Sequence, residues 1–399
     1  MSNIEIISKE ACFSCRSCEQ SCPKKCIQML ENEEGFLYPS VTKDNCIDCG
    51  VCLKHCPVKI NHLVEKDFDK EFYALKLSDS DKLQESSSGG LFSGLAEYVL
   101  DCGGVVFGAA YNGDLQVNHV SVSNYEKLCL LKGSKYVTSN TKDTFFQVKK
   151  ILSEGKIVLY SGSPCQIAGL YSYLGNKPEN LYTVDIICHG VPSQKLFNKY
   201  IQWLETKLGE KIIYYGFRDK DVGGWTCGGK TKTKTKTKTK IINGAMDPYY
   251  SSFMRGETYK LSCYSCPFAS VENRPADISI GDFWGVELLY PQFESKNGVS
   301  CCIINNEKGK KLFDLTKNKF DFITVTEESV CKYNRQLKSP MIKPQKRDNI
   351  YVGIDTLPLN KFINRLNASF FTRTKRYLIS LIPSNLKVFI KRSLKDKDR

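Results

Sequence analysis

The feature that most constrains this chain is a pair of cysteine motifs within its first 56 residues. Each motif has the spacing C-x2-C-x2-C-x3-C and is followed by proline. Three closely spaced thiolates can bind three irons of one [4Fe-4S] cube, and the fourth cysteine then reaches the other cube. The spacing therefore predicts two clusters with crossed ligands. The first would be held by Cys12, Cys15, Cys18 and Cys56, and the second by Cys46, Cys49, Cys52 and Cys22.

A zinc knuckle and a disulfide framework are the alternatives for such a cysteine-rich segment. Zinc needs four ligands at one tetrahedral centre and makes no use of the proline after each motif. Residues 1–10 lack the basic and apolar regions of a secretion signal, so we expect a reducing cytoplasm, where disulfides are rare. The pattern is typical of a bacterial ferredoxin, and the chain is expected to transfer electrons.

The net charge of +14 is concentrated in two segments. Residues 230–240 contain six lysines, and residues 346–399 contain thirteen Lys and Arg against four Asp. The rest of the chain is therefore close to neutral. Because no nucleic-acid motif or interleaved aromatic series accompanies the basic segments, we expect no nucleic-acid partner. No stretch reaches the roughly 18 apolar residues that a membrane span needs.

Three domains are predicted from the pattern of elements. Residues 1–64 form an α+β ferredoxin domain built on a duplication that relates Cys12 to Cys46. Residues 72–345 alternate short apolar runs with amphipathic stretches, as α/β domains do, and residues 346–399 form a helical basic tail. Within the second domain we predict helices over 91–100 and from Pro164, and strands over 105–110, 157–160 and 181–188.

Two basic segments each leave two interpretations open. The Lys-Thr alternation of residues 230–240 suits an exposed strand or hairpin arm, or a repeat tolerated in a surface loop. The tail has apolar residues near helical spacing over 359–381, and Pro383 precedes a second short helix reaching Leu394. It is a candidate for peripheral contact with an anionic inner membrane surface, or an ordinary helical hairpin packed on the domain.

Electron transfer to an organic substrate needs a further cofactor, because clusters pass single electrons and flavin is the common one-to-two-electron converter. Two segments are candidates for it, although either one alone is also compatible with a simple solvated turn. The Ser/Gly loop at a helix start can present N–H groups to a phosphate, and the Lys-Gly-Ser-Lys-Tyr segment offers cations, hydroxyls and an aromatic ring. The candidate residues are Ser87, Ser88, Gly89, Gly90, Lys132, Ser134, Lys135 and Tyr136.

Four more cysteines are candidates for a third [4Fe-4S] cluster. Cys263 and Cys266 form C-x2-C-P, which repeats the chemistry of the N-terminal motifs. Cys165 follows a glycine turn and Cys188 ends a predicted strand, and either one alone would be taken as a core residue. His189, next to Cys188, is the candidate for a proton donor or relay, or is a hydrogen-bonded structural residue.

Six motifs in order now form a family pattern. They are Ser87-Ser88-Gly89-Gly90, Lys132-Gly133-Ser134-Lys135-Tyr136, Gly162-Ser163-Pro164-Cys165-Gln166, Cys188-His189-Gly190-Val191-Pro192, Cys263-Tyr264-Ser265-Cys266-Pro267 and Asp277-Ile278-Ser279-Ile280-Gly281-Asp282-Phe283-Trp284-Gly285. Over residues 1–290 the chain resembles the beta subunit family of coenzyme F420 hydrogenases and dehydrogenases. The resemblance implies FAD on the first two motifs and a cluster in the large domain. The expected fold is thus a two-[4Fe-4S] ferredoxin domain fused to a larger α/β flavin-binding domain, with a basic tail.

Three functions are compatible with this pattern. The first is an oxidoreductase that exchanges electrons between coenzyme F420 and a small ferredoxin or another redox partner protein. The second applies the same machinery to another organic two-electron substrate, for example in surface polysaccharide synthesis. The third is a non-catalytic electron-transfer adaptor, which would hold iron but no flavin. The Lys-Thr run and the basic tail depart from the family pattern and leave the partner surface open.

Overall fold

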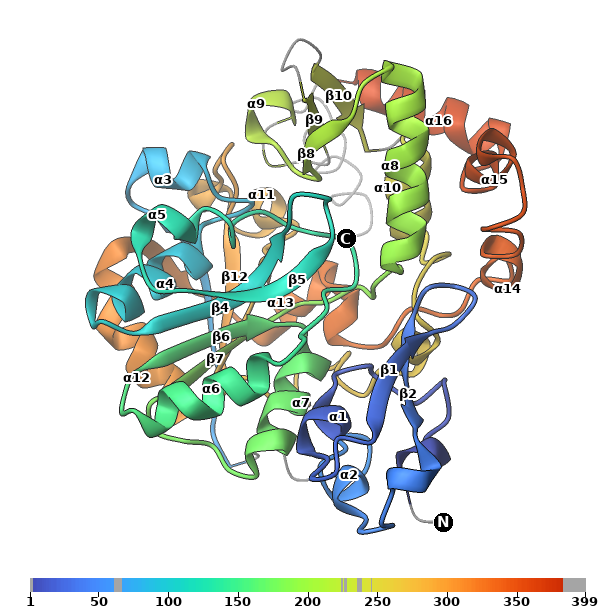
Figure 1. Ribbon diagram of the computed structural model, residues 1–399. Helices are drawn as coiled ribbons and strands as arrows, with labels where there is room; N and C mark the ends of the chain where they lie inside the picture. Colours follow the sequence, from blue (N-terminus) through green and yellow to red (C-terminus); the bar gives the residue numbers. More distant parts are fainter. Residues whose placement is uncertain are drawn as a thin grey trace.

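An eight-stranded mixed sheet forms the centre of the large domain (Figure 1). The computed structural model describes residues 3–60, 67–223, 225, 228–234, 239–244 and 246–382. The sheet has the order β13-β3-β12-β11-β7-β6-β4-β5, with parallel pairing from β11 through β7 and β6 to β4 and antiparallel pairing at both sides. Its strands are β3 (Glu71–Leu77), β4 (Val105–Tyr111), β5 (Val117–Val122), β6 (Val158–Gly162), β7 (Leu181–Ile186), β11 (Ile278–Asp282), β12 (Ser300–Ile304) and β13 (Phe320–Thr324).

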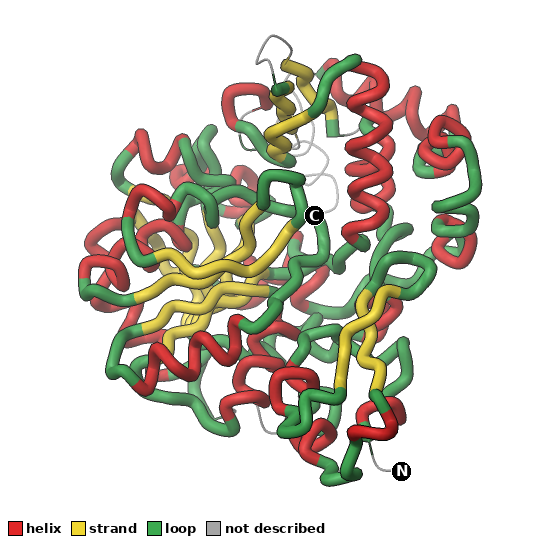
Figure 2. Tube along the Cα trace, in the orientation of Figure 1, coloured by secondary structure: helices red, strands yellow, loops and turns green. Residues whose placement is uncertain are grey.

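Helices cover both faces of this sheet, as Figure 2 shows. Its connecting helices are α3 (Ser80–Gln84), α4 (Leu91–Asp101), α5 (Tyr125–Leu128), α6 (Thr144–Ser153), α7 (Pro164–Leu174), α11 (Val286–Leu289), α12 (Glu307–Thr316) and α13 (Glu327–Tyr333). Successive strand residues point to opposite faces, so Leu159 packs with α4 and α12 while Tyr160 packs with α6 and α7. The central strand β7 is buried along most of its length, as parallel strands covered on both faces are.

A second core lies beside the sheet around the long helix α8 (Gln194–Leu208). It is rich in tyrosine and phenylalanine, and it includes Phe36 from the N-terminal module. Its other elements are β8 (Ile212–Gly216), α9 (Lys220–Gly223), β9 (Gly228–Thr233), β10 (Thr239–Asn243), α10 (Pro248–Met254), α14 (Arg347–Ile350), α15 (Leu359–Arg365) and α16 (Phe370–Leu381).

The N-terminal module, residues 3–60, contains little regular structure. A two-stranded antiparallel hairpin of β1 (Ile27–Glu31) and β2 (Leu37–Val41) separates two short helices, α1 (Ser17–Ser21) and α2 (Val51–Lys54). The two halves repeat the same backbone: φ is positive at Ser14 and Arg16, and again at Asp48 and Gly50. The duplication inferred from the cysteine spacing is therefore present in the conformation of both loops.

The module packs against α7 and the C-terminal segment (Figure 1). The module approaches α7 closely at Gly169, where a side chain would not fit because its Cβ would lie 2.7 Å from Cys15 Cβ. The side chain of Arg347 is 1% exposed, and its two terminal nitrogens donate to Glu34 at 2.7 and 2.6 Å. The module is thus fixed by contacts at both of its ends.

Most predicted elements agree with the structure, and one strand boundary differs. The expected strand 181–188 ends at Ile186, so Cys188 and His189 lie in the following loop. The Lys-Thr run forms the β9–β10 hairpin, with Thr231 and Thr233 buried and Lys232 exposed, while residues 235–238 lie outside the described residues. The hairpin interpretation of this run is therefore confirmed.

In the tail, Phe362 and Ile363 of α15 are buried against the second core. Two apolar side chains of α16, Phe371 and Leu378, are 80% and 57% exposed. The second predicted helix, from Ser384 to Leu394, lies outside the described residues. No helix of the described part of the chain is long and apolar enough to cross a membrane.

Candidate functional site

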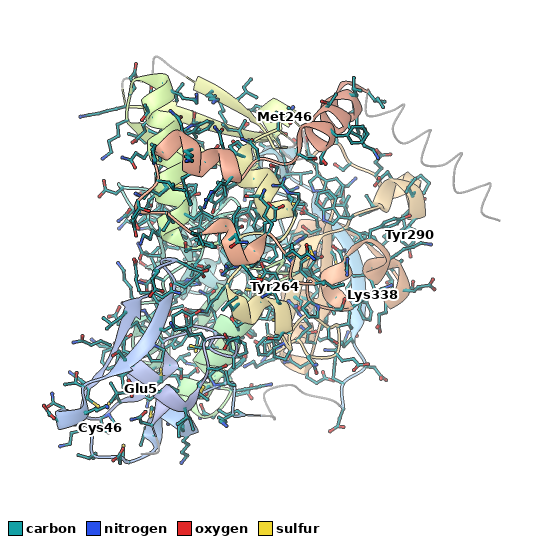
Figure 3. The ribbon with its side chains drawn as sticks, turned by 90° about the vertical axis from the view of Figure 1, so that its right-hand side faces the viewer. Glu5, Cys46, Met246, Tyr264, Tyr290 and Lys338 are labelled. Atoms are coloured by element: carbon teal, nitrogen blue, oxygen red, sulfur yellow. The ribbon has the colours of Figure 1, made fainter. Side chains whose placement is uncertain are left out.

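The eight N-terminal cysteines line two separate pockets. One pocket is lined by Cys12, Cys15, Cys18 and Cys56, and the other by Cys22, Cys46, Cys49 and Cys52, among other residues. Each pocket thus takes three cysteines from one motif and the fourth from the other, which is the crossed arrangement expected from the spacing. Cys46 lies at the outer tip of the module, away from the large domain (Figure 3).

The chemistry of these pockets suits an iron–sulfur cluster. Burial raises the pKa of the thiols of Cys15, Cys18 and Cys56, so without a cation they would be protonated. Iron supplies the positive charge that makes buried thiolates stable. No three His, Cys, Asp or Glu side chains in the described part of the chain converge tightly enough for a single ion. A cube does not need such convergence, because its four thiolates attach at separate corners.

Cys26, the ninth cysteine of the module, lies in the wall of the second pocket. Its sulfur is 3.4 Å from the sulfur of Cys22, and its side chain is buried. Cys26 falls outside the C-x2-C-x2-C-x3-C spacing, so only the fold reveals that it is beside a predicted ligand.

The structure also brings together the four cysteines of the large domain. Cys165 lies in the first turn of α7, Cys188 follows β7, Cys263 lies in the 3-10 helix Leu261–Ser265, and Cys266 caps that helix. Their thiols are close enough to interact electrostatically: Cys263 interacts with the other three. Burial raises the pKa of all four thiols, and raises that of Cys188 to about 12.

Arg274 holds the loops that carry two of these cysteines. It is 2% exposed, and it donates to the carbonyl of Phe268 at 3.1 Å, just after the Cys266 turn. It also donates to the carbonyl of Ile186 at 2.7 Å and pairs with the buried carboxylate of Asp185. A single buried guanidinium therefore fixes the end of β7, and with it Cys188, relative to the Cys266 turn.

The two predicted flavin segments lie side by side. The backbone N–H of Ser134 donates to the hydroxyl of Ser87 at 3.0 Å. The Ser88 hydroxyl donates to the Val299 carbonyl at 3.1 Å, and a Cβ on Gly89 would lie only 2.2 Å from the Leu75 carbonyl oxygen. Gly90 has φ +82 where α4 begins. The Ser/Gly loop is therefore pressed against the ends of β3 and β12.

The remaining residues of the second segment make contacts within the protein. Lys132 pairs with Glu85 at 2.8 Å, and the ring of Tyr136 stacks on Phe253 with 4.7 Å between centroids. Burial lowers the pKa of Lys135 to about 7. The ammonium of Lys135 donates to a ring of backbone carbonyls, those of Leu130, Leu131, Lys132 and Gly133.

His189 lies between the large-domain cysteines and the second flavin segment. Its Nδ1 accepts a hydrogen bond of 2.8 Å from the amide of Gln336, so the proton of the neutral ring is on Nε2. Burial lowers its pKa, and the carboxylate of Asp282 opposes that shift. The ring is 6.3 Å from that of Phe253, which stacks on Tyr136.

Sequence reasoning missed two cations near this site. Lys220 donates to the carbonyl of Ser88 at 3.0 Å, and burial lowers the pKa of Lys220 to about 8. Arg218 pairs with Asp282 at 2.5 Å. Nothing in the sequence distinguishes these residues from surface cations, because only the chain path after β8 carries them inward. Trp284, in the last of the family motifs, stacks on Trp225.

Comparison with known proteins supports both halves of this description. Residues 11–60 match the family model of the 4Fe-4S dicluster domain, and residues 155–329 match that of the C terminus of the coenzyme F420 hydrogenase/dehydrogenase beta subunit. These matches confirm the resemblance found in the motifs. One chain of the solved F420-reducing [NiFe] hydrogenase complex from Methanosarcina barkeri is similar to this protein. The similarity covers 72% of the present chain and 91% of the solved one, with 16% sequence identity and a TM-score of 0.45. The search of curated proteins found no match.

Proposed function

We propose that this iron–sulfur electron-transfer protein, which is related to F420 hydrogenase beta subunits, is an FAD-dependent oxidoreductase. It would pass electrons between its ferredoxin module and a two-electron organic substrate. The observation that carries this proposal is that the four large-domain cysteines lie together after β6, after β7 and before β11, with His189 next in the chain to Cys188. That arrangement suits a relay from the N-terminal clusters to a flavin.

The cysteines are assigned as follows. The two N-terminal pockets would each hold one [4Fe-4S] cluster on the crossed quartets. Cys165, Cys188, Cys263 and Cys266 would hold a third. Clusters supply one-electron transfer and FAD converts it to two-electron chemistry.

Electrons would enter or leave at the outer pocket. Cys49 is exposed there, and its neighbour Ile47 is 59% exposed, so a redox partner protein can approach this site closely. The other N-terminal pocket faces the large domain, where Thr141 donates to the carbonyl of Cys15 at 3.1 Å. The geometry therefore suits transfer along the module rather than directly from solvent to the large domain.

The flavin would be held by the two adjacent segments. Backbone and hydroxyl groups of Ser87, Ser88 and Gly90 would bind a phosphate, and Lys132 or Lys135 would supply positive charge. His189 is the candidate proton donor, because the proton on its Nε2 is not used by the Gln336 hydrogen bond. Its depressed pKa keeps the ring neutral near pH 7.

Coenzyme F420 is the first candidate substrate, on the strength of the family match to residues 155–329. A second candidate is another organic substrate, such as an intermediate of surface polysaccharide synthesis, for which the exposed apolar side chains of α16 would suit work at a membrane surface. A non-catalytic adaptor is the third hypothesis.

Anaerobic purification followed by acid release of flavin tests the first step. We expect FAD in the released fraction, and iron without flavin would leave only the adaptor. Stopped-flow mixing of the reconstituted protein with reduced F420 then tests the substrate. We expect bleaching of the flavin and cluster absorbance. No bleaching in protein that dithionite reduces would exclude F420 and point to the second candidate.

A further inference from the structure

Lys260 is a buried cation without a conventional partner. It precedes the 3-10 helix that carries Cys263, and it is 2% exposed. Within the described residues its ammonium has no hydrogen-bond acceptor. It lies 3.4 Å from the centroid of the Tyr38 ring and 5.3 Å from that of Phe36. Cation–π contacts offset only part of the cost of burying an ammonium, so this cation still needs an anionic partner.

The groups that face this ammonium belong to two different cysteine quartets. The thiols of Cys12, Cys263 and Cys165 and the carboxylate of Glu34 are near enough to interact electrostatically with it. Glu34 is already held by Arg347 in a bidentate pair. Cys12 belongs to the inner pocket of the module, while Cys263 and Cys165 belong to the large domain. Lys260 therefore lies where these two sites meet.

The backbone fixes the position of Lys260 on both sides. Its N–H donates to the carbonyl of Val191 at 3.0 Å, and its carbonyl accepts from the N–H of Cys263 at 3.0 Å. Val191 follows the Cys188 loop, and so the main chain of Lys260 links the loops of two large-domain cysteines. Its ammonium reaches the ring of Tyr38 in the β1–β2 hairpin of the module.

The missing anion has a natural source. A [4Fe-4S] cube with four thiolate ligands carries a net negative charge, which increases by one when the cube takes up an electron. In a buried setting a fixed ammonium stabilises that added charge, because the effective dielectric is low. The effect falls off with distance, so it should act on the two nearest sites and leave the outer pocket unaffected.

We infer that Lys260 is the shared counter-charge of the inner N-terminal cluster and the large-domain cluster, and that it raises the reduction potentials of both. This inference rests on the proposed function, since it needs a cluster on Cys165, Cys188, Cys263 and Cys266. Each cluster gains one electron from its reductant and no bond is made or broken. Lys260 is an electrostatic positioning residue, not a catalytic one.

The test is an anaerobic redox titration monitored by EPR, with iron content measured on each sample. In Lys260→Met, which keeps the length of the side chain without its charge, two of three midpoint potentials should move to more negative values. The third, from the outer pocket, should stay where it is. Lys260→Arg should keep the wild-type potentials. Lys195→Met removes another module-facing charge, which contacts the carbonyl of Glu33 at 3.1 Å, and should change none.

Each other result has a distinct meaning. Unchanged potentials in Lys260→Met, or equal shifts of all three, would overturn the inference. If Lys260→Met loses iron, recovery in Lys260→Arg would support a role for the charge, and loss in both variants would contradict it. Wild-type protein with iron for only two clusters would overturn the third cluster of the proposed function. The effect of Lys260 on the inner N-terminal cluster would then remain measurable, with one potential expected to shift.

Discussion

The two regions that carry cysteine quartets are built in opposite ways. The N-terminal module has a small core in which cysteines take a large share, with Cys18, Cys52 and Cys56 packed against Ile4 and Ile27. The large domain has an extensive aliphatic and aromatic core on both faces of its sheet, and its cysteine quartet lies in the segments that connect its strands.

The contrast separates folding from function. In the module, ligands and core are the same residues, so metal binding and folding are expected to be one event, as they are in other small metal-dependent domains. In the large domain the sheet can form without iron, and the segments that connect its strands place the cysteines afterwards. Four predictions test this contrast, beginning with the one that would break it.

Removing iron should unfold the module and spare the sheet. Apart from its cluster sites, the described part of the module has a short hairpin, two α-helices of five and four residues, two 3-10 helices of three residues each and a core too small to be stable alone. Hydrogen exchange followed by mass spectrometry should show lost protection in α1 and α2, while β6 and β7 stay protected. Equal protection of α1 and α2 with and without iron would contradict the comparison.

Replacing Cys263 and Cys266 together with serine should remove one cluster without unfolding the protein. Iron should fall by about four atoms per chain, because the cube would lose two of its four ligands. Hydrogen exchange of the sheet should be unchanged. Cys102→Ser, at an exposed cysteine outside all three quartets, is the matched control and should retain all iron. Full iron content in the double variant would exclude this site.

The stability of the large domain should depend on pH through His119. Burial lowers the pKa of His119 to about 4, and the ring is held between Ser139 at 2.7 Å and the Ser161 carbonyl at 3.0 Å. The unfolded chain binds a proton below about pH 6.5 and the folded one does not, so stability falls as pH drops from 6.5 towards 4. The expected loss is about 1.4 kcal/mol per pH unit in that window.

Chemical denaturation of wild type and His119→Gln at pH 5.5 and 7.5 measures this effect. The wild type should lose more stability at the lower pH than the variant, in which the titrating group is absent. An identical difference between the two pH values in both proteins would show that His119 does not set the dependence. Iron content is measured at both pH values, so that cluster loss is not mistaken for proton uptake.

Breaking the contact between Glu34 and Arg347 should loosen the module with a smaller cost. Arg347→Met removes a buried bidentate pair, but Glu34 is 24% exposed and can be hydrated, so we expect a loss of about 2 kcal/mol. Exchange in the β1–β2 hairpin should increase while the sheet is unaffected. Lys343→Met removes an exposed pair with Asp348 in the same segment and should cost close to nothing. Equal effects of the two variants would argue against a role for burial.

The predictability of the sites follows from the same contrast. The N-terminal quartets could be assigned from spacing, because all their members lie within one short segment and a cube requires that spacing. The large-domain quartet could not be derived this way. Cys165 and Cys188 have no local spacing to Cys263, so the sequence offered them only as candidates, which the family motifs supported, until the fold brought them together.

Charges were the least predictable part of the site. Lys260 and Lys220 look like surface lysines in the sequence, and the burial of Lys260 and the partial burial of Lys220 follow from the docking of the module and from the turn after β8. Conversely, Thr231 and Thr233 belong to a polar repeat, yet they face inward in the β9–β10 hairpin. Period-two alternation predicts that the two faces of the strand carry different side chains, but it does not predict which face the rest of the protein covers.

The pair of Glu34 and Arg347 also has a consequence for how the protein is made. The two residues are 313 positions apart. A ribosome that adds 5–20 residues per second needs about 15 to 60 s to pass from one to the other. Both N-terminal cysteine motifs are therefore synthesised well before the arginine that clamps their module in place. Iron delivery during synthesis would meet an open module, whereas iron lost from the finished protein would have to be replaced through a closed one.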